Sequence, residues 1–101
     1  MTSQGSPYAR FQRALRTGDL TIIRACAAEL PRVDLGDALS VCIAIREAEP
    51  DRFERAALRW LARFAAEHAR TVSDVQAAAA AMTAMRGDPD GALHTLHRLC
   101  R

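Results

Sequence analysis

Turn signals of one kind recur along the chain, and they limit most strongly the folds that it can adopt. Gly18-Asp19, Pro50-Asp51 and Gly87-Asp88 each combine a residue that stops a helix with an aspartate that can cap the next one. The segments between them carry apolar residues at helical spacing, and none shows the sustained alternation of a β-strand. The sequence therefore predicts an all-α fold, a compact bundle of about six antiparallel helices.

Short connections between these helices make successive helices antiparallel and predict three αα-hairpins. The expected helices cover residues 7–17, 19–30, from 34 onward, 52–69, from 71 or 73 to 86, and from about 90 to the end. The capping aspartates lie 32 and 37 residues apart, so a short tetratricopeptide-like stack is the alternative arrangement. We expect a flexible N-terminus over residues 1–6 and a single helical domain over residues 7–101.

The third predicted helix is apolar over more than half of its circumference, so we expect it to be the most buried. Its apolar residues are Leu35, Ala38, Leu39, Val41, Cys42, Ile43 and Ile45. In the fifth helix, an alanine run removes bulk, which allows a neighbouring helix to approach its backbone closely.

The fourth predicted helix has two distinct faces. Arg52, Arg59 and Arg63 project along one line, and Arg55 lies beside it. The opposite arc is formed by Phe53, Ala57, Trp60, Leu61, Phe64 and Ala65. We expect the aromatic arc to enter the core and the arginine stripe (Arg52, Arg55, Arg59 and Arg63) to face outward. The preceding Pro50-Asp51, with Glu54, has the spacing of an acidic capping box.

Charge and cysteine usage point to a cytoplasmic protein without a strong attraction to nucleic acid. All fourteen basic residues are arginine, yet the net charge is only +2. The cysteines Cys26, Cys42 and Cys100 are dispersed and form no Cys-x-x-Cys pair, which predicts reduced thiols, with Cys42 buried and Cys26 mostly buried. No apolar run approaches the ~18 residues of a membrane span, and the first residues do not resemble a signal peptide.

No group of residues predicts catalysis, a cofactor or a metal site. His94, His97 and Cys100 follow one another at three-residue steps, but each step rotates by about 60°, so the outer two point far apart. His68 projects near Phe64 on the inner side of its helix, which is typical of a boundary histidine rather than a catalytic base. The carboxylates lie mostly at helix starts, where capping explains them.

The arginine stripe has two interpretations. A row of guanidinium groups could contact phosphates or an acidic protein surface. Alternatively, the stripe is a solvated face whose arginines pair with Glu47, Glu49, Glu67 and the helix-start aspartates. The small net charge favours the second interpretation, as does an arginine content that GC-rich coding would explain.

Four runs of residues resemble a group of small uncharacterised helical proteins of actinobacteria. The runs are Phe11–Leu15, Gly18–Leu20, Asp37–Leu39 and Glu49–Trp60, within a resemblance that covers about residues 8–65. It is most specific in the segment from Arg52 to Trp60. The resemblance brings no activity and implies a bacterial cytoplasmic origin.

These observations predict a non-enzymatic helical module that binds another protein, either an unidentified partner or a second copy of itself. The alternative function is weak nucleic-acid binding or regulation through the arginine stripe. Nucleic-acid binding is disfavoured because Trp60 and Phe64 project inward, where they cannot stack on bases.

Overall fold

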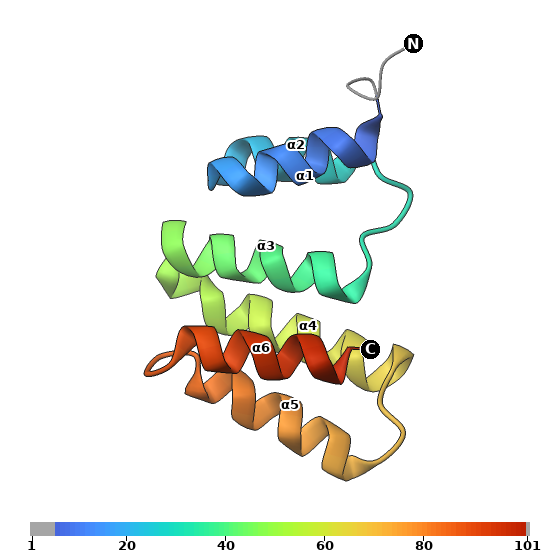
Figure 1. The fold of residues 1–101 in the computed structure, drawn as a ribbon, viewed down its shortest axis with the longest axis vertical. Helices are drawn as coiled ribbons and strands as arrows, with labels where there is room; N and C mark the ends of the chain where they lie inside the picture. The colour runs from blue at the N-terminus through green and yellow to red at the C-terminus, as the bar shows by residue number, and fades with distance from the viewer. Residues whose placement is uncertain (1–5, 101) are drawn as a thin grey trace. The chain divides into compact units, whose positions relative to one another are not determined.

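The computed structural model describes residues 6–100, and this part of the chain is helical with no strand (Figure 1). Its elements are α1 (Pro7–Thr17), α2 (Leu20–Ala28), α3 (Leu35–Ala48), the 3-10 turn η2 (Pro50–Arg52), α4 (Phe53–Glu67), α5 (Val72–Ala84) and α6 (Pro89–Leu99). The predicted all-α class is confirmed. Of the N-terminus that we expect to be flexible, residues 1–5 lie outside the described residues.

The chain divides into two compact units, residues 1–54 and 55–101, which we describe separately. The first contains α1, α2, α3 and η2, and the second contains α5, α6 and all but the first two residues of α4. The single domain expected over residues 7–101 stays a prediction.

Polar side chains begin most of the helices, because the first N–H groups of a helix have no partner within it. The Ser6 hydroxyl accepts a hydrogen bond from Ala9, and the carboxylates of Asp19, Asp34 and Asp88 accept from Ile22, Asp37 and Gly91. Thr71 and Asp74 form a reciprocal capping box at α5. Gly18 ends α1 with φ +73°, a left-handed conformation that glycine adopts at little cost.

In the first unit, α1 and α2 form a hairpin, and α3 packs against both (Figure 1). Phe11, Ala14 and Ile23 form the centre of the core, and half-buried residues of α3, including Val41 and Ala44, pack against them. Within α3 every residue except the last two, Glu47 and Ala48, is buried or half-buried. This confirms the expectation that the third helix is heavily buried.

In the second unit, α5 and α6 lie side by side as a second hairpin (Figure 1). The buried side chains come from all three helices: Ala56, Ala57, Trp60 and Phe64 of α4, Ala78, Ala81 and Met82 of α5, Met85 after it, and Ala92 and Leu96 of α6. The small side chains of α5 allow the close approach of a neighbouring helix that the alanine run predicts.

Some helix ends differ from the prediction. The fourth helix begins at Phe53 rather than Arg52, because Pro50–Arg52 forms a 3-10 turn ahead of it. Asp51 therefore lies inside that turn and not at the capping position of α4, so the predicted acidic capping box is wrong. The helices α2, α4 and α5 end two residues earlier than expected, at Ala28, Glu67 and Ala84.

Candidate functional site

The orientation of α4 about its own axis decides which residues it presents to solvent. Trp60 and Phe64 are 2% and 1% exposed, so the aromatic arc enters the core as predicted. However, Ala56, which lies next to the arginine stripe, is buried, whereas Ala65 of the predicted inner arc is exposed. The helix is thus turned relative to the prediction, because its two largest apolar side chains, and not its alanines, set the centre of the buried arc.

This rotation exposes a surface that the sequence pattern did not indicate. Arg55, Leu58, Arg59 and Ala62 are all exposed, and their i, i+3, i+4 and i+7 spacing places them on one side of the helix. We call these four residues the α4 outer face. Leu58 is 59% exposed, which makes it one of the few large apolar side chains of the described chain that are exposed rather than buried or half-buried.

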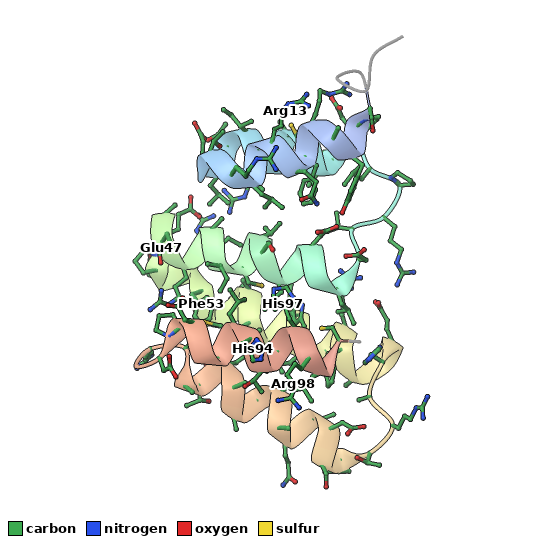
Figure 2. All side chains as sticks on the ribbon, viewed as in Figure 1. Arg13, Glu47, Phe53, His94, His97 and Arg98 are labelled. Carbon is green, nitrogen blue, oxygen red and sulfur yellow. The ribbon has the colours of Figure 1, made fainter. Side chains whose placement is uncertain are left out.

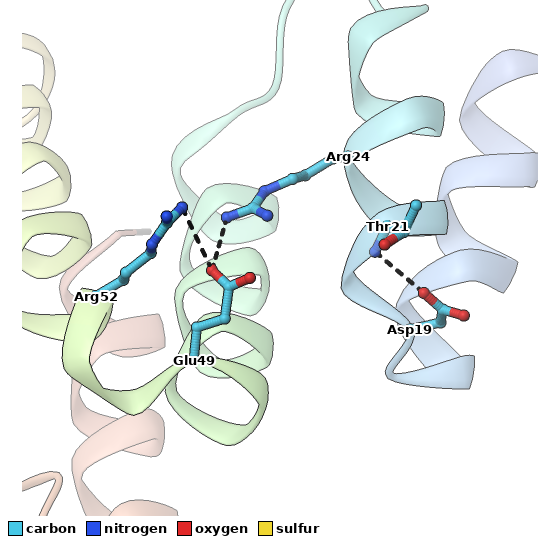
Figure 3. A network of polar contacts seen from close by, with 5 residues as sticks. All are labelled: Asp19, Thr21, Arg24, Glu49 and Arg52. Carbon is cyan, nitrogen blue, oxygen red and sulfur yellow. Dashed lines mark hydrogen bonds and ion pairs between the residues drawn. The ribbon is translucent and has the colours of Figure 1, made fainter.

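Two arginines of the predicted stripe have carboxylate partners. Arg52 lies on η2 rather than on α4, and its Nη1 is 3.7 Å from Oε1 of Glu49 (Figure 3). The same oxygen accepts a hydrogen bond of 3.2 Å from Nη2 of Arg24, which joins α2 to the segment after α3. Arg63 forms a bidentate pair with Glu67, its Nε and Nη2 lying 2.9 and 3.2 Å from the two carboxylate oxygens.

Arg55 and Arg59 differ from these two arginines. Neither forms an ion pair with any residue that the structure describes, and both are exposed on consecutive turns of α4. The pairing that the sequence favours for the stripe is therefore present at Arg52 and Arg63, through Glu49 and Glu67. The remaining guanidinium groups, those of Arg55 and Arg59, lie in a row along one side of Leu58 and Ala62.

The outer face is carried by a well-anchored helix. The rings of Trp60 and Phe64 are stacked at 5.4 Å with an interplanar angle of 9°, and the ring of His68 lies 5.8 Å from that of Phe64. His68 is thus a half-buried boundary residue beside Phe64, in the position that its projection predicts. Because Trp60 and Phe64 are almost fully buried, a rotation of α4 about its axis would expose them to water, and the α4 outer face therefore keeps a defined orientation.

His94 and His97 lie on α6, and Cys100 directly follows this helix. His94 is exposed and His97 and Cys100 are half-buried, and Figure 2 shows His94 and His97 on this helix. Within residues 6–100 there is no group of three or more His, Cys, Asp or Glu side chains that could hold a metal ion. Cys42 is 5% exposed, as predicted, whereas Cys26 is half-buried at the edge of the first core.

Two ionisable groups with shifted pKa values act in helix packing and capping. The Tyr8 hydroxyl donates a hydrogen bond of 3.1 Å to Asp37, which ties α1 to α3, and this bond raises the pKa of Tyr8. The Asp74 carboxylate accepts hydrogen bonds from the backbone N–H groups of Arg70 and Thr71, and these bonds lower the pKa of Asp74. Both shifts have structural causes, and neither group lies on the α4 outer face.

Comparison with known protein families, with curated proteins and with solved structures finds no match to this chain. Over the residues that the structure describes, every helix is too short or too polar to cross a membrane.

Proposed function

We propose that this protein is a non-enzymatic interaction module that binds another protein through the α4 outer face. The observation that carries the proposal is the exposed Leu58 beside Arg55 and Arg59, two exposed arginines without a carboxylate partner among the described residues. Burying Leu58 against a partner would remove apolar surface from water, which favours association. The two guanidinium groups would add charge-assisted hydrogen bonds to carboxylates of that partner.

A protein partner fits this surface better than nucleic acid does. Proteins that bind single strands place aromatic side chains beside their basic residues so that bases can stack on them. On α4, Trp60 and Phe64 are buried on the opposite side of the helix, and Phe53 is half-buried. The neighbours of Arg55 and Arg59 on the α4 outer face are instead the aliphatic side chains Leu58 and Ala62, and arginine beside exposed apolar surface is typical of protein interfaces.

We further propose a bacterial cytoplasmic location. The three cysteines are dispersed along the sequence and form no Cys-x-x-Cys pair, and such usage is typical of proteins in a reducing compartment.

The proposal is tested by affinity capture from a lysate of the source cells, with the tagged wild-type chain and an Arg55→Gln/Arg59→Gln variant as baits. A matched control bait carries Arg86→Gln and Arg98→Gln, which remove two exposed arginines elsewhere in the second unit. We expect one protein to be captured by the wild type and the control, to remain after nuclease treatment and to be lost with the Arg55→Gln/Arg59→Gln variant. Equal capture of that protein by all three baits would contradict the assignment to this surface.

Binding to polyanions separates the alternative function from the proposed one. If the α4 outer face binds nucleic acid, single-stranded DNA should bind at low salt, and its affinity should fall steeply as salt rises. We expect no such binding that depends on Arg55 and Arg59. DNA binding that the Arg55→Gln/Arg59→Gln variant loses would replace the proposed function with the alternative.

A further inference from the structure

We infer that the partner presents an amphipathic acidic helix to the α4 outer face. The inference rests on the proposed function and deepens it, because it names the chemistry of the segment that docks. It follows from two rows of side chains on α4 and from the charges around them.

The first row is apolar and uneven in size. Leu58 and Ala62 are one helical turn apart, about 6 Å along the axis, and both are exposed. A large side chain beside a small one creates a protrusion followed by a recess. This relief fits the ridges and grooves of another helix, whose apolar side chain would lie over Ala62 and against Leu58.

The second row is basic. Arg55 and Arg59 are also one turn apart and lie next to the first row. Because neither has a carboxylate partner among the described residues, both guanidinium groups can pair with a partner without breaking an existing ion pair. Carboxylates spaced by one turn on the partner helix would match this repeat, since both helices rise about 6 Å per four residues.

The negative charge of Glu54 determines on which side of the docking helix the carboxylates lie. Glu54 is exposed and lies one turn before Leu58, on the side of the helix away from Arg59. An acidic residue of the partner would be repelled there, whereas it would be attracted beside Arg55 and Arg59. The docking segment should therefore carry its carboxylates along one flank only, with its apolar residues beside them.

The inference is tested by selecting a phage-displayed library of random 16-residue peptides against the purified wild-type chain. We expect the selected peptides to share leucine-type residues at helical spacing with Asp or Glu on one flank. Selection of neutral or basic peptides, or no enrichment of any sequence, would overturn the inference. Because the library does not depend on the cellular partner, this result is independent of the capture experiment that tests the proposed function.

A synthetic peptide of the enriched sequence is then titrated against four variants. We expect Arg55→Gln/Arg59→Gln and Leu58→Ser each to weaken binding about tenfold, and Arg86→Gln/Arg98→Gln and Val72→Ser to leave it unchanged. Val72 is the matched control for Leu58, because it is 77% exposed at the start of α5. Unchanged circular dichroism and Trp60 emission show that the variants are folded, and equal affinity for all four would refute the inferred surface.

Discussion

The burial of Trp60 and Phe64 gives a quantitative prediction about what holds α4 in place. Both side chains are almost fully buried, and their rings are nearly parallel at 5.4 Å. Trp60→Ala removes an indole from a close-packed environment and leaves a cavity that neighbouring side chains fill only in part. Such substitutions cost about 3–5 kcal/mol, against a total stability of roughly 5–15 kcal/mol for a domain of this size.

The expected loss is easily measured. For a chain of about this length, each kcal/mol shifts Tm by roughly 4–8 °C, so Trp60→Ala should lower Tm by roughly 12–40 °C. Thermal unfolding followed by circular dichroism at 222 nm gives this shift for Trp60→Ala, Phe64→Ala and the double variant. Because the rings contact each other, the double variant should lose less stability than the two single losses added, by about 0.5–1.5 kcal/mol.

Leu58→Ala is the matched control, since it truncates an apolar side chain of the same helix that is 59% exposed, and it should change Tm little. A Trp60→Ala variant with the melting curve of the wild type would refute the reasoning. Strict additivity of the two single losses would show that the ring stack itself contributes nothing.

Three further predictions concern the rest of the chain. Gly18→Ala should lower the free energy of unfolding by about 1–2 kcal/mol, because Gly18 has a φ of +73° that alanine adopts only with strain. Gly87→Ala is the control, since Gly87 has no positive φ and its replacement should leave the stability nearly unchanged. Equal losses of stability in chemical denaturation would contradict this. Tyr8 is the single tyrosine, so its ultraviolet titration should give a pKa above the ordinary value, and Asp37→Asn should lower it. Because the pKa of Tyr8 is raised on folding, its hydrogen bond stabilises the fold fully below the ordinary tyrosine pKa, and this stabilisation is lost as pH rises through the raised pKa. A Tyr8→Phe variant with the same alkaline unfolding profile as the wild type would contradict this pH dependence. A thiol reagent should label Cys100 rapidly and Cys42 slowly under native conditions, and the reverse order would contradict the burial of α3.

The helices could be predicted from the sequence because their ends are determined locally. Asp19, Asp34 and Asp88 cap the helices that they precede, and Gly18 ends α1 in the left-handed conformation. These interactions involve residues within a few positions of one another, so the sequence pattern contains them. The acidic box expected at Asp51 failed for the same local reason, since Pro50 begins a 3-10 turn there.

The α4 outer face was harder to predict because it depends on which apolar residues of the helix are buried in the core. Alanine is compatible with either environment, and the pattern of α4 could not show that Ala56 is buried while Ala65 is exposed. That difference of orientation brings Leu58 to the surface. Likewise, the spacing of the arginine stripe indicated that carboxylates could pair with it but not which carboxylate pairs with which arginine. Glu49 pairs across space with Arg24 as well as with Arg52, a contact between residues far apart in sequence.

The most direct test of the central claim places a photo-crosslinking amino acid at position 62, the small and exposed site within the α4 outer face. A second variant carries the same group at Thr83, which is exposed on α5. After irradiation of the source cells, we expect a nuclease-resistant protein adduct at position 62. This adduct should be absent at position 83 and should be lost when Arg55 and Arg59 are changed to Gln. Adducts of equal yield at both positions, or no protein adduct at position 62, would contradict it.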